Sequence, residues 1–106
     1  MATLRADISI SELNERSSEY LPGYLGIEIL ELAPNTLHSR MPIKKLHFAP
    51  NDFLHAASIV ALADTSCGYA TIAHLPEGAQ SFTTIELKSN HMGTVKEGSI
   101  ACVATA

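Results

Sequence analysis

A carboxylate within the most apolar stretch of the chain is the first candidate for chemistry. Asp64 follows the run Val-Ala-Leu-Ala at 60–63 and lies near the middle of residues 56–75. Burying a carboxylate is costly unless it has a partner or a purpose, and burial raises its pKa unless hydrogen-bond donors compensate. Two interpretations stay open. Asp64 is either catalytic, or a structural aspartate that bonds a strand hydroxyl or is exposed at a helix–helix contact.

The residues that lead into this stretch are the second candidate. Asn51 precedes His55, Ala56 and Ala57, where we expect a helix to begin. A helix start exposes free backbone N–H groups and the positive end of the helix dipole. Small side chains let a ligand carbonyl approach these donors, which would polarise it and stabilise an oxyanion. The alternative is an ordinary helix cap, with His55 bonded to nearby backbone instead of orienting a ligand.

Two adjacent hydroxyls form the third candidate. Thr83 and Thr84 lie in the run Ser-Phe-Thr-Thr-Ile-Glu at 81–86. Hydroxyls at these positions could hold a nucleophilic water, although threonine is also simply a common strand residue.

The spacing of the first two candidates constrains any site that uses both. His55 and Asp64 are nine positions apart, so a straight helix separates them by roughly 13 Å along its axis and points them to opposite sides. One carbonyl group cannot contact both in the same chain. We therefore expect a site shared by two subunits, whose helices pack antiparallel about a two-fold axis.

The elements that must position these residues can be read from their patterns. Serine and glutamate at positions 9 and 12 fit a capping box, and alternating apolar residues followed by a turn indicate a hairpin. The central helix is apolar on nearly all sides, so other structure must wrap it. We predict one α+β domain over 1–106, an antiparallel sheet around one long central helix, with a helix at 9–20, a hairpin at 25–43, the central helix at 55–74 and strands at 80–106.

Composition excludes several classes of protein. The net charge is −4 and no basic run is present, so nucleic acid is not an expected partner. Asp64 interrupts the apolar stretch, so we expect a buried helix and no membrane association. Residues 1–10 contain no apolar signal-peptide region, and Cys67 and Cys102 are expected to be reduced core thiols, which together predict a cytoplasmic protein. The histidines show no metal-ligand spacing, so no metal is predicted.

These pieces together resemble a known family. The run Leu-His-Ala-Ala at 54–57, Leu-Ala-Asp at 62–64 with Gly68, Thr-Ile-Glu-Leu at 84–87, and Gly98 before a strand are similar to PaaI-type thioesterases. These belong to the 4-hydroxybenzoyl-CoA thioesterase-like superfamily. The resemblance covers about residues 23–106 and implies the hotdog fold.

The resemblance also implies an activity and the roles of residues. It implies hydrolysis of an acyl-CoA thioester by a homodimer with shared sites, and leaves open whether dimers pair into a homotetramer. Coenzyme A would enter only as part of the substrate, with no other cofactor. Asp64 would be the nucleophile or the general base, and the Ala56 N–H would polarise the carbonyl. Thr84 would also be catalytic, holding water or assisting Asp64. The substrate-binding roles fall to Asn51, His55, Ala57 and Thr83.

The sequence departs from the family pattern in three respects. The family has two glycines where this chain has Ala56 and Ala57, and its Asn-to-His segment is two residues longer. Family members normally continue for two or more strands beyond the position of Ala106, so we expect a truncated chain with uncovered helix surface and a bare strand edge. The alternatives are a non-catalytic acyl-CoA binder, an inactive fragment, or a hotdog dehydratase.

Overall fold

The computed structural model describes residues 3–106. Its regular elements are three helices, one 3₁₀ turn and three strands. In chain order they are α1 (Ile10–Ser17), α2 (Leu21–Leu25), β1 (Glu28–Ala33), β2 (Thr36–Pro42), the 3₁₀ turn η1 (Lys45–His47), α3 (Ala56–Ala73) and β3 (Ser99–Thr105).

The three strands form one antiparallel sheet in the order β1-β2-β3. The predicted hairpin is confirmed: β1 and β2 are joined at Pro34 and Asn35, and Asn35 has the left-handed backbone conformation (φ 60°) that this turn requires. β3 pairs with β2 along its whole length, from Pro42 opposite Ser99 to Thr36 opposite Thr105. The other edge of β3 has no partner strand among residues 3–106.

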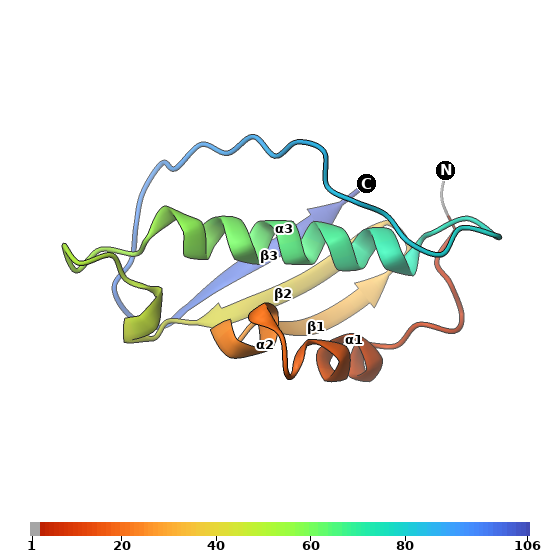
Figure 1. Ribbon diagram of the computed structural model, residues 1–106, viewed down its shortest axis with the longest axis horizontal. Helices are drawn as coiled ribbons and strands as arrows, with labels where there is room; N and C mark the ends of the chain where they lie inside the picture. The colour runs from red at the N-terminus through yellow and green to blue at the C-terminus, as the bar shows by residue number, and fades with distance from the viewer. Residues whose placement is uncertain (1–2) are drawn as a thin grey trace.

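α3 lies across one face of this sheet and confirms the predicted central helix (Figure 1). Alternate residues of the strands point toward it, as their period of two requires. At one end Met41 and Ile27 pack with Leu62 of α3. At the other end Leu37 and Ala104 form a second buried cluster, which α1 completes with Leu13. A direct bond between the Ser39 and Ser66 hydroxyls (2.6 Å) satisfies both buried groups.

The N-terminal region differs from the prediction of one helix over residues 9–20. Ser9 does cap α1, because its hydroxyl accepts a hydrogen bond from the Glu12 N–H (3.2 Å), but α1 ends at Ser17. A second short helix, α2, was not predicted; it follows α1 and contains Pro22 in its first turn. Proline is tolerated in the first turn of a helix because its missing N–H would have no intrahelical acceptor there. Gly26 then ends α2 in a left-handed conformation (φ 81°).

The predicted strand at 80–90 is wrong. Residues 79–95, here called the return segment, have no regular secondary structure and no paired strand among the described residues. Figure 1 shows the segment running back over α3, on the side away from the sheet, to reach the start of β3. Only the last part of the predicted 80–106 strand region is a strand, as β3.

α3 is the one helix in residues 3–106 whose length and hydropathy would allow it to cross a membrane (18 residues, mean hydropathy 1.2). The core helix of a soluble domain has the same properties. Here α3 packs on β2 and β3 through its sheet-facing side.

Candidate active site

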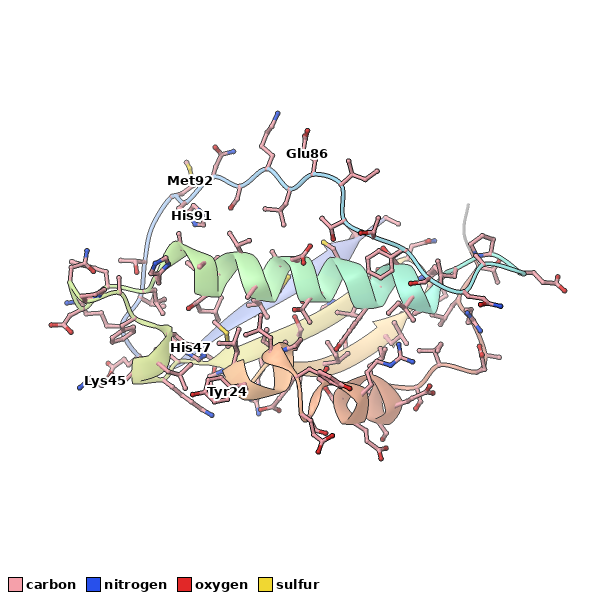
Figure 2. All side chains as sticks on the ribbon, in the orientation of Figure 1. Tyr24, Lys45, His47, Glu86, His91 and Met92 are labelled. Carbon is pink, nitrogen blue, oxygen red and sulfur yellow. The ribbon has the colours of Figure 1, made fainter. Side chains whose placement is uncertain are left out.

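The start of α3 is held by a fully buried histidine. His47 Nδ1 accepts a hydrogen bond from the Lys44 N–H (2.9 Å), so its Nε2 donates to the Leu25 carbonyl (2.7 Å). The His47 carbonyl in turn accepts from the His55 N–H (2.9 Å) and from the Ser58 hydroxyl (2.9 Å). This one residue therefore ties the end of α2 to the first turn of α3 (Figure 2).

His55 is the N-cap of α3 and leaves one backbone donor free. Its Nδ1 accepts from the Ala57 N–H (3.0 Å), and its carbonyl accepts from the Ser58 N–H (2.9 Å). The Ala56 N–H has no acceptor among the described residues. His55 thus acts as the helix cap that was predicted as the alternative to a ligand-orienting role. The free Ala56 N–H is the donor that was expected to polarise a carbonyl, whereas the Ala57 N–H is already bonded to His55.

A hollow of about 370 Å³ lies beside this free donor. Its wall includes Ala56, Phe53 and Ile59 on one side, and His91 and Met92 of the return segment on the other. Figure 2 shows His91 and Met92 above the first turn of α3. Asn51 is not among the lining residues; its side-chain oxygen accepts from the Phe53 N–H (3.1 Å) and shapes the loop before α3.

Asp64 lies two turns further along α3 and is exposed, so the carboxylate carries no cost of burial in the single chain. The Thr84 hydroxyl donates a hydrogen bond to Asp64 Oδ1 (3.1 Å). The two residues line a cleft of about 350 Å³ between α3 and the return segment, together with Thr83. Figure 2 shows the Glu86 side chain pointing away from α3, although Glu86 is also one of the residues that line the cleft.

Cys67 borders the same cleft, and it corrects the prediction of two core thiols. The residue as a whole is exposed, whereas Cys102 is half-buried. Desolvation of the Cys67 thiol raises its pKa, and the charges of Cys102 and Asp64 act in the same direction. A raised pKa keeps a thiol protonated, and a protonated thiol is a poor nucleophile.

The structure therefore brings the predicted residues together in two groups. Ala56, Ala57 and His55 share the start of α3, and Asp64, Thr83 and Thr84 share the cleft. Ala56 and Asp64 border different hollows of one chain, and their eight-residue separation corresponds to roughly 12 Å of helix.

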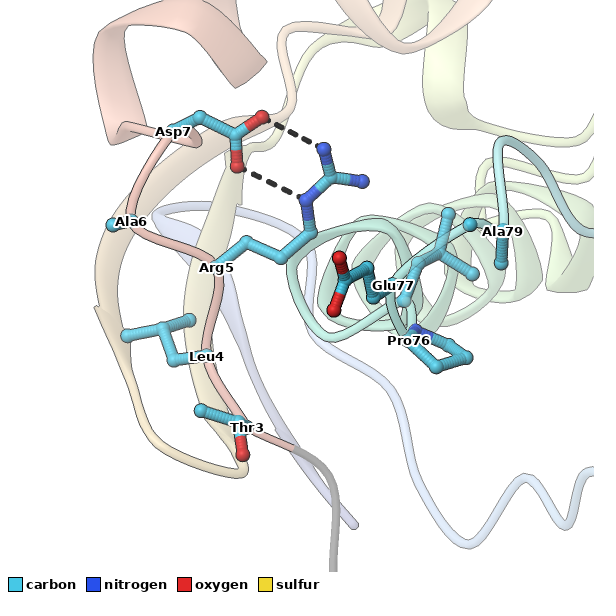
Figure 3. Close-up of a pocket in the computed structure, with 10 residues that line it drawn as sticks. Thr3, Leu4, Arg5, Ala6, Asp7, Pro76, Glu77 and Ala79 are labelled. Atoms are coloured by element: carbon cyan, nitrogen blue, oxygen red, sulfur yellow. Dashed lines mark hydrogen bonds and ion pairs between the residues drawn. The ribbon is translucent and has the colours of Figure 1, made fainter.

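A hollow larger than these two lies elsewhere in the described chain. It measures about 630 Å³ between residues 3–7 and 75–79, and contains none of the predicted site residues. Figure 3 shows that Arg5 there is held by Asp7 through two hydrogen bonds (2.7 and 3.0 Å). Within residues 3–106 no three His, Cys, Asp or Glu side chains gather as a metal site would require.

His47 and Ser58 are the residues of this region that sequence reasoning missed. His47 sits in a loop with no periodicity, and a serine in the first turn of a helix is unremarkable by type. The one available signal was that a histidine between apolar neighbours, Leu46 and Phe48, needs buried hydrogen-bond partners.

Comparison with known proteins supplies the family. The profile of the thioesterase superfamily matches residues 51–106, which is more than half of the chain and includes every predicted site residue. This chain belongs to the thioesterase superfamily. Among curated proteins, the thioesterase-superfamily chain is similar to "Putative esterase ComA2" of Bacillus subtilis, at 31% identity over 76% of this chain and 64% of that protein. It is 28% identical to the 1,4-dihydroxy-2-naphthoyl-CoA hydrolase of Escherichia coli, over 88% of this chain and 68% of that protein.

Solved structures confirm the predicted hotdog fold. A thioesterase from Haemophilus influenzae superposes with a TM-score of 0.87 at 27% identity, covering 96% of this chain and 71% of that one. A thioesterase from Pseudomonas aeruginosa gives a TM-score of 0.89 at 22% identity, over 96% and 73%, and shows the fold alone. The chain thus spans about two thirds of the length of the curated relatives it matches, 64% and 68% of the two named above.

Proposed function

We propose that this chain is a subunit of a PaaI-type acyl-CoA thioesterase that hydrolyses a thioester to a carboxylic acid and coenzyme A. One observation carries the proposal: a single helix, α3, carries both a carboxylate and a free N–H donor. Asp64 lies in a cleft on α3 and accepts a hydrogen bond from Thr84, and the Ala56 N–H at the start of α3 has no acceptor among the described residues. The coenzyme A thioester named as the substrate of the Escherichia coli relative supports this class of substrate.

The chemistry assigns one task to each group. The Ala56 N–H donates to the thioester carbonyl oxygen and stabilises the negative charge that grows on it. As a general base, Asp64 removes a proton from water, whose oxygen attacks the carbonyl carbon; the C–S bond then breaks, and the departing thiolate takes up a proton. As a nucleophile, Asp64 instead attacks the carbonyl carbon; the C–S bond breaks, coenzyme A leaves as a thiolate that takes up a proton, and water then hydrolyses the acyl–Asp64 anhydride to the acid and the free carboxylate. In both routes Thr84 orients the carboxylate.

A shared site follows from the distances. Ala56 and Asp64 of one chain are separated by roughly 12 Å of helix axis, which is too far for one carbonyl. A second copy with its α3 antiparallel to the first would bring its Asp64 to the free Ala56 donor, and would also cover the exposed carboxylate. The proposal therefore includes a homodimer, located in the cytoplasm, where free Cys67 and Cys102 remain reduced.

The first test is thiol release from a panel of aryl- and alkyl-CoA substrates, comparing the chain with Asp64→Asn. We expect turnover by the parent and a loss of about a hundredfold or more in kcat for the variant, as general-base groups contribute. Asp64→Glu, which keeps the charge, is the matched variant. If the folded parent binds acyl-CoA but turns over no substrate, the protein is a binder; if it hydrates an enoyl-CoA without releasing thiol, it is a dehydratase.

Single-turnover hydrolysis in H₂¹⁸O separates the two roles of Asp64. If Asp64 is the nucleophile and water attacks the anhydride at the Asp64 carboxyl carbon, the label enters Asp64 and the product acid carries an unlabelled protein oxygen. Label found in Asp64 therefore identifies the nucleophilic route. A general base would send all of the label to the product acid. Mass spectrometry of the peptide that contains Asp64 is the measurement.

A further inference from the structure

The return segment touches α3 at an unusually close point. A β-carbon placed on Gly68 would lie only 2.9 Å from Cζ of the Phe82 ring, closer than real β-carbons approach other atoms. The ring therefore occupies the space that any other residue at position 68 would fill. Gly68 is buried under it, whereas the neighbouring Ile85 is 95% exposed and makes no comparable contact.

The spacing of this contact matches that of the Asp64–Thr84 hydrogen bond. Asp64 and Gly68 are four residues apart on α3, which places them on one face about 6 Å apart. Phe82 and Thr84 are two residues apart on an extended segment, which places them on one side about 7 Å apart. The segment runs opposite to α3 (Figure 1), so the order also agrees: Phe82 meets Gly68 and Thr84 meets Asp64.

We propose that Phe82, seated on Gly68, is a positioning residue that sets the register of the return segment and so places the Thr84 hydroxyl on Asp64. The inference rests on the proposed function for its catalytic consequence. The contact is needed because the segment has no strand partner among the described residues, and its remaining bonds are few and exposed. Among residues 3–106, the Thr84–Asp64 hydrogen bond is the one hydrogen bond that joins the return segment to α3, so the ring on Gly68 is the packing contact that fixes which residue faces Asp64.

Gly68→Ala and Phe82→Ala test this directly. Alanine is the better helix former, so Gly68→Ala does not weaken α3 itself. Its methyl displaces the ring and moves Thr84, and we expect kcat to fall by about tenfold with KM nearly unchanged, since small misplacements of catalytic groups are costly. Phe82→Ala should have a similar effect. Either change combined with Thr84→Val should be no worse than Thr84→Val alone, because both act through the same hydrogen bond.

Rescue by a smaller partner distinguishes positioning from general damage. The double variant Gly68→Ala with Phe82→Leu exchanges bulk between the two sides, and should recover most of the lost kcat. Ser89→Thr adds the same methyl to the exposed part of the segment and should leave kcat unchanged. Failure of the double variant to recover while it remains folded, or full activity in Phe82→Ala, would overturn the proposal.

A second measurement does not depend on activity. Lys88 lies in the return segment and is exposed, so limited trypsin digestion reports how firmly the segment is held. Cleavage after Lys88 should be several-fold faster in Gly68→Ala and Phe82→Ala, and return to the parent rate in the double variant. If the parent shows no thiol release but these rates change as expected, the proposed function fails and the contact stands; unchanged rates in both single variants refute the contact.

Discussion

The two halves of the candidate site lie on one helix but are held in very different ways. At the start of α3, a fully buried His47 and the Ser58 hydroxyl fix the backbone through four hydrogen bonds. At Asp64, the carboxylate is exposed and has one partner, Thr84, on a segment without secondary structure. The donor half, which is the start of α3 with the free Ala56 N–H, is held entirely within a single chain. The acid half, which is Asp64, depends on Thr84 of the irregular return segment for its one hydrogen bond. A two-subunit enzyme would be built this way if one copy supplies a rigid donor and the other the acid.

The strongest test of this difference is to inactivate the donor half in one chain and the acid half in another. Ala56→Pro removes only the free N–H, because proline is tolerated at the first helical position and His55 already has an extended backbone (φ −70°, ψ 132°). We expect kcat to fall by about a hundredfold to a thousandfold, as for loss of an oxyanion donor. Ala56→Ser, which keeps the N–H, is the control.

Mixing Ala56→Pro with Asp64→Asn then tests where the halves meet. If the site joins Ala56 of one copy to Asp64 of the other, random pairing after refolding restores about one quarter of the parent activity. Thiol release by the mixture is the readout. No recovery in a mixture shown to contain heterodimers would mean that both residues act within one chain.

The rigidity of the donor half predicts a large stability effect. His47→Leu leaves the Lys44 N–H and the Leu25 carbonyl without partners, and we expect it to lower the free energy of unfolding by about 2–4 kcal/mol. Urea denaturation measures this, and Ser58→Ala, which removes one bond, should cost about 1 kcal/mol. Equal stability of His47→Leu and the parent would show that the helix start is not held as described.

The looser acid half predicts an effect on the catalytic rate and almost none on stability. Thr84→Val removes the hydroxyl that bonds Asp64 and should lower kcat by about tenfold, less than the roughly hundredfold or more contributed by a general acid or base itself, because Thr84 only orients the carboxylate. The urea midpoint should hardly move, because Thr84 is exposed. Thr84→Ser keeps the hydroxyl and should retain activity; equal losses in both variants would instead assign a packing role to the threonine methyl.

The smallest expected effect lies outside both halves. Hydrogen bonding and the charge of Arg5 lower the pKa of Asp7. This pairing therefore adds stability above the ordinary pKa of an aspartate, and the contribution is lost as pH falls through the lowered value. The pair is at the surface, so its effect on unfolding should be close to undetectable. In an NMR titration, Arg5→Gln should bring the Asp7 pKa back toward its usual range; an unchanged pKa would contradict the pairing.

Much of the fold was predictable because the signals are local. The hairpin alternates polar and apolar residues, and α3 is a long apolar run with helical spacing. The type of each element can therefore be predicted from the residues of that element alone. The strand predicted at 80–90 failed for the opposite reason. Threonine, phenylalanine and isoleucine fit a pleated surface, but strand propensity cannot report whether a partner strand is there to pair with.

The site was predictable only in part, for a similar reason. The cap by His55 follows from its place before Ala56, but Asp64 and Thr84 are separated by twenty positions with an irregular segment between them. No periodicity connects such a pair, and only the resemblance to thioesterases suggested that they cooperate. Whether Asp64 is buried or exposed stayed open, because an apolar sequence around a carboxylate does not say which face of the helix the sheet covers.

The outer edge of β3 has consequences for any measurement on this protein. Its backbone donors and acceptors have no strand to pair with among residues 3–106, and such an edge is a template for another strand. Self-association along it would make folding a bimolecular equilibrium. The melting temperature should then rise with protein concentration, and a stability quoted without that concentration would not be a property of the chain alone.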